Sequence, residues 1–155
     1  MSRYIELTKD KRVIVDDEDY EFLMQWKWCY NAGYALRGDA KNNTKILMHR
    51  VLMSTPEDME VDHINQNKLD NTRINLRNVS ISENQMNRGK YANNTSGFKG
   101  VSWHKRLNKW QVSIQAHKKT IHLGYFTAIK EAALNYNMGA IKYHGEFAVL
   151  NLIEE

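Results

Sequence analysis

The sequence predicts an α+β protein made of two small modules. A strand–strand–helix order is expected over residues 61–88, where apolar segments flank an asparagine-rich loop, and a strand–strand–strand–helix order is expected from residue 98 onward. A polar stretch with two glycines, residues 89–97, lies between them and is the predicted linker. A chain of 155 residues is long enough for one ordinary domain or two small ones.

Basic residues are concentrated in the second half of the chain. The formal net charge is +4; residues 1–88 carry 13 Lys and Arg against 14 Asp and Glu, whereas residues 89–155 carry 9 against 4. From Gly89 to Lys130 there are eight basic residues and no acidic one. A charge run is usually a solvated face, but a long acid-free stretch in a folded segment favours a polyanionic partner, here nucleic acid.

Composition also excludes several classes of protein. The single cysteine, Cys29, rules out an intramolecular disulfide framework and a multi-cysteine zinc site, and it is expected to be a half-buried structural residue. The N-terminus lacks the apolar run of a signal peptide, and no segment reaches transmembrane length. We therefore expect a soluble, cytoplasmic protein with no membrane partner.

Residues 1–43 are expected to form a β-rich segment that packs on the module after it. Two short strands, 4–7 and 12–15, precede a helix capped by Asp16 that continues to Gln25. A hairpin follows, with strands 28–30 and 34–37 around a three-residue loop, 31–33. The aromatic residues of this segment are interpreted as core rather than as a ligand-binding box; they are Trp26, Trp28, Tyr30 and Tyr34.

Candidate catalytic residues surround the asparagine-rich loop of residues 65–75. Asp62 and His63 end a predicted strand, a second short strand begins near Asn75, and Asn84 follows on a helix that Ser80 and Glu83 are suited to cap. One carboxylate and one amide oxygen on adjacent elements suit a hard divalent cation, Mg²⁺ or Mn²⁺. Histidine has an unperturbed pKa suited to accepting a proton from water near neutral pH.

The order and spacing of these motifs resemble the HNH homing endonuclease family, in its cysteine-free, phage- and intron-associated branch. The matching pieces are Asp-His-Ile at 62–64, Asn-Leu-Arg at 75–77 and Glu-Asn at 83–84. The resemblance implies a nuclease module over residues 44–88 with a ββα-metal fold. It also implies that His63 is the general base, that Asp62 and Asn84 bind the metal, and that Asn75 braces the loop that aims His63.

The pair His49-Arg50 corresponds to a His-Arg pair that often precedes this motif. Two roles stay open for Arg50, contact with a DNA phosphate or a structural role, and no role is assigned to His49. Each candidate residue also has a plainer reading, since Asn and Asp are common in turns.

The C-terminal half predicts a three-stranded antiparallel sheet covered by one helix. Strands are expected at 98–103, 110–115 and 119–123, and a helix capped by Thr127 is expected to reach about His144. Residues 98–151 resemble the Apetala/ethylene-response-factor DNA-binding domain, through Lys-Gly-Val-Ser at 99–102, His-Leu-Gly-Tyr-Phe at 122–126 and Gly-Glu-Phe-Ala-Val-Leu-Asn at 145–151. The resemblance implies that the sheet lies in the DNA major groove.

The predicted DNA contacts combine polar, basic and aromatic side chains of these strands and turns. They are Lys99, Ser102, Trp103, His104, Lys105, Arg106, Lys109, Gln111, Ser113, Gln115 and His122. Trp110 lies on the same face of the predicted strand as Val112 and Ile114 and is assigned to the core. The corresponding sheet face of the plant domains is richer in Arg, so phosphate contact is expected to dominate here.

The hypothesis is therefore a monomeric, divalent-metal-dependent HNH endonuclease that nicks or cuts double-stranded DNA. It would act in a bacterial or phage-infected cell, as a homing-type enzyme, with no obligate protein partner. One alternative is a DNA-binding or regulatory protein without cleavage activity. Another is a nuclease acting on RNA or damaged DNA, which a major-groove reader disfavours because A-form RNA hides that groove.

Overall fold

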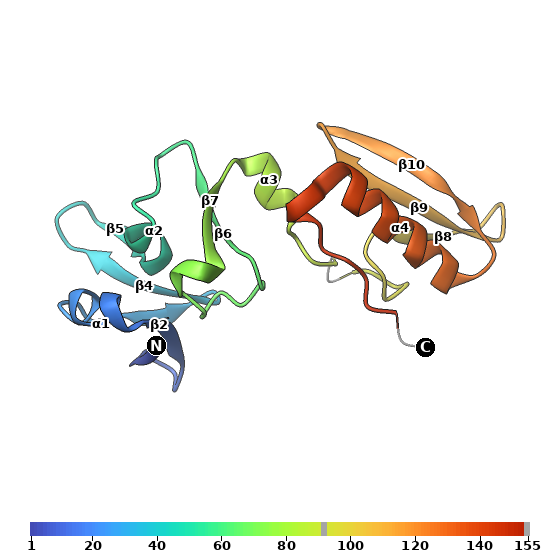
Figure 1. The fold of residues 1–155 in the computed structure, drawn as a ribbon. Helices are drawn as coiled ribbons and strands as arrows, with labels where there is room; N and C mark the ends of the chain where they lie inside the picture. The colour runs from blue at the N-terminus through green and yellow to red at the C-terminus, as the bar shows by residue number, and fades with distance from the viewer. Residues whose placement is uncertain (91–92, 154–155) are drawn as a thin grey trace. The chain divides into compact units, whose positions relative to one another are not determined.

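In the computed structural model, residues 1–90 and 93–153 are described, and the chain divides into two compact units, Met1–Ile81 and Ser82–Glu155 (Figure 1). Each unit combines helices with small antiparallel sheets, so the predicted mixture of α and β structure is confirmed. Within the described residues, no helix has the length and apolar character needed to cross a membrane.

The first unit contains three small sheets and two short helices. Its elements are β1 (Ser2–Glu6), β2 (Arg12–Asp16), α1 (Asp17–Leu23), β3 (Cys29–Asn31), β4 (Tyr34–Asp39), β5 (Thr44–Leu47), α2 (Met48–Leu52), β6 (Glu60–His63), the 3₁₀ turn η1 (Arg73–Asn75) and β7 (Leu76–Val79). The sheets are β1-β2, β3-β4-β5 and β6-β7. One apolar cluster joins these elements, because its members run from Ile5 to Leu76 and include the fully buried Val13 and Leu23.

Two local predictions in this unit need correction. Asp16 precedes α1 as predicted but makes no side-chain cap; its Oδ2 accepts a hydrogen bond from the Arg73 backbone N–H at 2.7 Å instead. The β3–β4 turn has two residues rather than three, because Asn31 pairs with Tyr34. Ala32 and Gly33 have φ of 49° and 94°, as expected for a tight turn that follows the right-handed twist of its strands.

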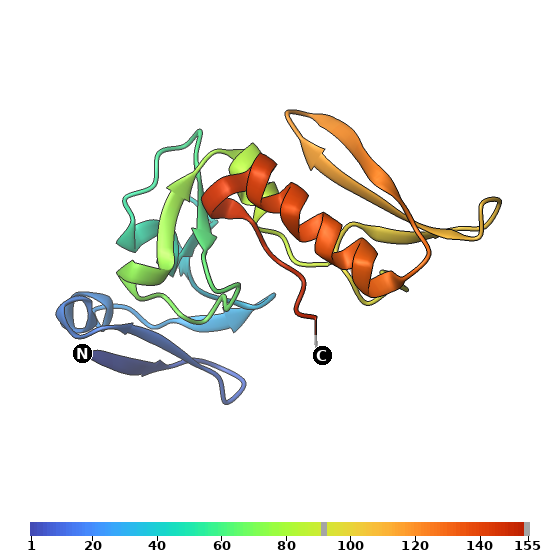
Figure 2. The ribbon, with the colours of Figure 1, turned by 45° about the vertical axis from the view of Figure 1, so that its right-hand side comes forward.

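The second unit is a three-stranded sheet covered by one long helix (Figure 2). It contains most of α3 (Ile81–Met86), followed by β8 (Val101–His104), β9 (Lys109–Ala116), β10 (Lys119–Phe126), α4 (Ile129–His144) and the 3₁₀ turn η2 (Gly145–Phe147), and its strand order is β10-β9-β8. Val112 and Ile114 of β9 pack against Ala132, Ala133 and Tyr136 of α4. The predicted apolar stripe of the helix is thereby confirmed.

The boundaries of this unit differ from the prediction at three places. The strand predicted from residue 98 starts at Val101, because Gly100 has a φ of 73° that extended backbone does not allow. The residue before α4 is Ala128, so Thr127 is not its cap. Strand β10 extends to Phe126 with a bulge at Leu123, between the pairs His122–Ser113 and Gly124–Val112.

Gly100 offers a test of this packing. A methyl group at Gly100 would overlap the Tyr136 ring and lie 2.7 Å from the Ser113 carbonyl oxygen, whereas one at Gly97 would meet nothing within 4 Å. Both residues have positive φ, so an alanine at either costs about 1–2 kcal/mol of backbone strain. Gly100→Ala should cost a further ~1–3 kcal/mol from overpacking, measured by urea denaturation. Equal losses for Gly97→Ala and Gly100→Ala would contradict the described contact.

Candidate active site and nucleic-acid surface

Asp62 and His63 lie at the end of β6, where β6 pairs with β7. The register places Asp62 opposite Arg77 and His63 opposite Leu76. Both side chains are buried, with relative exposures of 4% and 6%. The strand pairing therefore holds the two candidate residues in a fixed and largely dry position within the first unit.

A hydrogen bond to Asn71 orients the His63 ring. Nε2 of His63 lies 2.9 Å from Oδ1 of Asn71, whose side chain is fully buried. With the amide oriented in this way its oxygen accepts, so Nε2 carries the hydrogen and Nδ1 of the neutral ring carries the lone pair. Asn71 was not singled out among the many asparagines of the sequence, because spacing alone does not separate a buried amide from one that serves a turn.

Asn75 braces the loop that leads away from His63. Its side-chain oxygen accepts from the Asn65 N–H at 2.9 Å, and its amide nitrogen donates to the Asp70 carbonyl oxygen at 2.7 Å. Its backbone carbonyl accepts from the Ile64 N–H at 2.9 Å. One asparagine thus ties both ends of the loop together, which is the geometry that a bracing role requires.

The N-terminal strands fix the other side of this loop. The Ile14 N–H of β2 donates to the Leu69 carbonyl oxygen, and the Asn71 N–H donates to the Ile14 carbonyl oxygen, each at 2.8 Å. Residues that precede the nuclease motif in sequence therefore hold the loop that contains Asn71.

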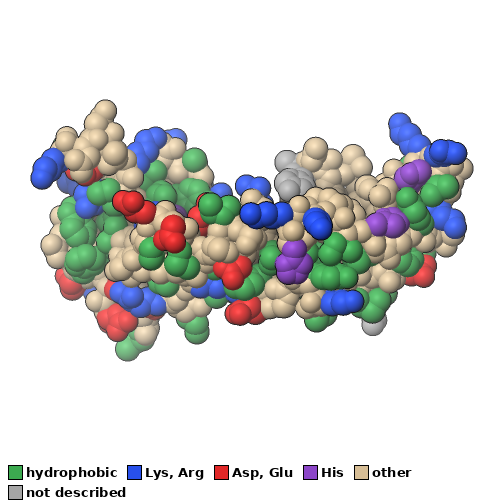
Figure 3. All heavy atoms as spheres, turned by 90° about the horizontal axis from the view of Figure 1, so that it is seen from above, with side chains coloured by type: hydrophobic (Ala, Val, Ile, Leu, Met, Phe, Trp, Pro, Cys, Tyr) green, Lys and Arg blue, Asp and Glu red, His purple; other side chains and the backbone are tan. Residues whose placement is uncertain are grey.

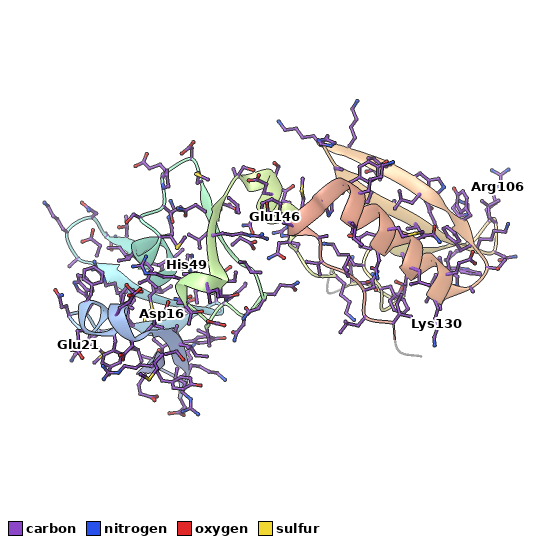
Figure 4. All side chains as sticks on the ribbon, viewed as in Figure 1. Asp16, Glu21, His49, Arg106, Lys130 and Glu146 are labelled. Carbon is purple, nitrogen blue, oxygen red and sulfur yellow. The ribbon has the colours of Figure 1, made fainter. Side chains whose placement is uncertain are left out.

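His49, which Figure 4 labels, lies in the interior of the first unit. Its ring packs edge-on against that of His63. The two ring centroids are 5.0 Å apart, and the Tyr34 ring lies 5.3 Å from His49 and 6.2 Å from His63. The Lys68 ammonium group lies 4.4 Å from the centre of the Tyr34 ring. Tyr34 was predicted only as a core residue and Lys68 was not predicted at all, so the structure adds both to the surroundings of the site.

Burial keeps these histidines neutral. It lowers the pKa of His49 to about 3, assisted by the neighbouring His63 and Arg50. Burial also lowers the pKa of His63, although the Asn71 hydrogen bond and the Asp62 carboxylate act in the opposite direction. A neutral imidazole near pH 7 is the form that can accept a proton.

Asp62 is held by an ion pair across the two strands. Its Oδ2 accepts from both Nε and Nη2 of Arg77, each at 2.9 Å. The side chains of both residues are mostly buried. Sequence spacing alone assigned no role to Arg77. The strand register places it directly opposite Asp62, the candidate metal ligand.

Arg50 is bonded to the backbone of the loop after α2. Its guanidinium donates to the Met59 and Pro56 carbonyl oxygens at 2.9 and 2.8 Å, and to that of Thr55 at 3.4 Å. These bonds support the structural alternative for this residue rather than a phosphate contact.

Asn84 lies in α3, which belongs almost entirely to the second unit, whereas Asp62 lies in the first. Asn84 is half-buried and interacts with other residues of the protein.

The face of the β8–β10 sheet opposite α4 is polar and carries several predicted DNA contacts. Register places Ser102, Gln111 and Tyr125 side by side, and it pairs His104 with Lys109 and His122 with Ser113. The Tyr125 ring lies 5.3 Å from His104 and 4.5 Å from His122. Histidine side chains lie among lysine and arginine side chains in the view of Figure 3, and Arg106 lies in the β8–β9 turn (Figure 4).

Two predicted contacts lie elsewhere in the second unit. Trp103 pairs with Trp110 at a ring distance of 4.9 Å, and Trp110 packs on the apolar core as predicted, so both belong to the helix side of the sheet. Nζ of Lys99 donates to the Met86 carbonyl oxygen at 2.7 Å in a partly buried position. Tyr125 was missed because a bulge at Leu123 precedes it, and bulges cannot be seen in simple alternation.

Comparison with known proteins bears on this site. Residues 54–86 match the family described as HNH endonuclease. The chain is 28% identical over 144 residues to the protein named "Uncharacterized HNH endonuclease L560" of Acanthamoeba polyphaga mimivirus. The aligned region covers 88% of this chain and 73% of the relative. It is 32% identical over 93 residues to "Protein 3.8" of Escherichia phage T7, covering 60% of this chain and 76% of the relative. The chain belongs to the HNH endonuclease family. No solved structure matches it significantly.

Membership of this family supports an enzyme that cleaves DNA over a protein that only binds it. The matched segment of this HNH endonuclease contains all four residues of the proposed centre, Asp62, His63, Asn75 and Asn84. Both relatives come from viruses.

HNH nucleases generally use a divalent metal ion. The described residues contain no group of three or more His, Cys, Asp or Glu placed to hold a metal ion. One carboxylate and one amide oxygen are what Mg²⁺ or Mn²⁺ uses when water and substrate phosphate complete its shell.

The buried His49 makes stability depend on pH. Its pKa of about 3 lies below the value of 6.5 expected in the unfolded chain, so the unfolded state binds more protons and stability falls as pH drops from 6.5 toward 3. Between about pH 6.5 and 5, this one residue should lower the free energy of unfolding by about 2 kcal/mol. The variant His49→Phe should make the free energy of unfolding depend less on pH, as measured by urea denaturation at a series of pH values. An unchanged pH slope would refute this assignment.

Proposed function

We propose that the protein is a divalent-metal-dependent endonuclease that hydrolyses phosphodiester bonds in duplex DNA, with His63 as its general base. The single observation that supports it best is the His63 environment: a buried ring, bonded through Nε2 to Asn71 and carried on a loop braced by Asn75. The Asp62 carboxylate beside His63 favours the imidazolium that would form when the ring accepts a proton.

Proton transfer from water is the role proposed for the Nδ1 atom of His63. Because Nε2 donates to Asn71, the lone pair of the neutral ring is on Nδ1, and the lowered pKa keeps the ring unprotonated at neutral pH. After attack on phosphorus, His63 would hold the proton as an imidazolium stabilised by the nearby Asp62 charge. The Asn75-braced loop limits the rotation of the ring during this step.

Asp62 and Asn84 are proposed to hold one Mg²⁺ or Mn²⁺ ion, whose chemistry when bound is neutralisation of charge on the scissile phosphate and its leaving oxygen. Sequence spacing within the HNH motif supports this pairing. The chain order β6, β7, α3 is the order that a ββα-metal module would have. Arg77 orients the Asp62 carboxylate from the neighbouring strand.

The second unit is proposed to be an Apetala-type DNA-binding domain that docks its polar sheet face in the major groove. Gln111 and Ser113 on the central strand are able to meet base edges, and Lys105, Arg106 and Lys109 at one end of the sheet are able to meet phosphates. The viral relatives support a homing-type or phage-associated role. One nuclease centre per monomer would cut one strand at each event.

Replacing the base should separate catalysis from binding. His63→Ala is expected to lower the rate of supercoiled-plasmid nicking about 10²–10⁴-fold, the range that general bases contribute. DNA affinity should change little, because the ring is buried. Asp62→Ala and a chelator should also abolish nicking, whereas Asp58→Ala, which removes an exposed carboxylate four residues earlier, should not. Equal nicking by all these proteins would end the proposal.

The dependence of DNA affinity on salt concentration tests whether the sheet contacts DNA phosphates. For the His63→Ala chain, six phosphate contacts predict a slope of about −5 in a plot of log affinity against log salt. Lys105→Gln should reduce the slope by about 1, because one phosphate contact is lost. Lys130→Gln, the same charge change in the first turn of α4, should leave it unchanged. A slope near zero would exclude the proposed mode of binding.

A further inference from the structure

The second unit contains a cavity of about 480 Å³ beside β9. The described lining residues include four Lys or Arg, two His and no Asp or Glu. The cations are Arg88, Lys90, Lys99 and Lys118. A cavity with this lining attracts an anion, because nothing inside it offsets the positive charge.

The sheet itself leaves room for this cavity. Pairing of β8 with β9 begins at Val101 and Val112, and the last backbone bond in that direction is from the Ser113 N–H to the Gly100 carbonyl oxygen at 2.9 Å. Strand β9 continues to Ala116, so its last residues extend past the start of β8. Residues 85–90 and Asn94 contribute to the wall beside this part of β9.

Two basic side chains of the cavity wall are held by backbone carbonyl oxygens. Lys99 has no carboxylate partner among the described residues; its Nζ donates to the Met86 carbonyl oxygen, and burial lowers its pKa to about 8. His144 is 6% exposed, its Nε2 lies 2.7 Å from the Gln115 carbonyl oxygen, and within residues 1–90 and 93–153 its buried Nδ1 has no partner.

The side chains of the wall favour a ligand that has both a charged and an apolar part. Because a carbonyl oxygen can only accept, Nε2 of His144 carries the hydrogen, and its bond to the Gln115 carbonyl oxygen holds the imidazole in the wall of the cavity. The lysine and arginine side chains need an anion. Val101, Ile114 and Tyr136 form an apolar part of the wall.

We infer that this cavity binds a phosphate-bearing nucleotide, either free or as one nucleotide of a DNA strand. The phosphate would bind Lys99, Arg88 and Lys118, and the sugar or base would fill the apolar part of the cavity. The volume lies in the range of small-molecule sites, and a phosphate alone would leave most of it empty. Ser113 and Gln115 of the polar sheet face also line the cavity, so a strand docked on that face could supply the nucleotide; this second source rests on the proposed function.

Calorimetry of the full chain with dAMP at low salt tests the site. Arg88→Gln and Lys118→Gln change exposed residues, so the fold should persist, and each is expected to weaken dAMP binding about tenfold. Lys130→Gln, with the same charge change on the exposed surface of α4 (Figure 4), should alter the affinity less than about twofold. Failure of dAMP to bind at millimolar concentration, or equal losses in all three variants, would overturn the inference.

Inorganic phosphate tests the class of ligand. It should bind more weakly than dAMP, because it leaves the apolar part of the cavity empty. Phosphate that binds as tightly as dAMP would refute a nucleotide ligand.

A duplex carrying 2-aminopurine identifies the source in the His63→Ala background. Brighter emission on binding, lost in Lys118→Gln, would assign the ligand to the DNA strand; unchanged emission together with dAMP binding would assign it to the free nucleotide. The dAMP result does not depend on cleavage, so a chain that binds dAMP but cannot nick plasmid would refute the proposed nuclease and leave the cavity assignment standing.

Discussion

The position of His63 depends on a set of amide hydrogen bonds that fold one loop onto itself. Asn75 closes the loop from within, Asn71 holds the imidazole, and Ile14 of a distant strand fixes the outer side. Asparagine suits this task because its amide both donates and accepts without bringing a charge into the interior. A lysine or aspartate in place of Asn71 would place an ionised group against the histidine and change its proton affinity.

The two units hold basic groups away from solvent to different degrees and in opposite ways. In the first, His49 and His63 are packed so closely that burial removes their charge, and the aromatic contacts with Tyr34 hold the rings in place. In the second, Lys99 keeps a hydrogen bond to a carbonyl oxygen and faces a cavity without acids. The first arrangement prepares a base, and the second prepares a place for an anion.

Much of this could be predicted from the sequence, because alternation and turn residues are local signals. The pairing of β6 with β7, the sheet of β8 to β10 and the apolar face of α4 follow from such patterns. The sequence did not reveal α2 or β5, which are only five and four residues long. It also could not separate Asn71 from its neighbours, pair Arg77 with Asp62, or show that Lys99 is bonded to the Met86 carbonyl oxygen, since these facts depend on contacts between distant segments.

The bulge at Leu123 changes the phase of β10 halfway along the strand. Before it, Ile121 points to the helix and His122 to the other face; after it, Tyr125 shares the face of His122 although three positions separate them. Leu123 and Phe126 still reach the core. One additional residue therefore lets a single strand seal the interior and place two neighbouring rings on its outer surface, which a strictly alternating strand of the same composition could not do.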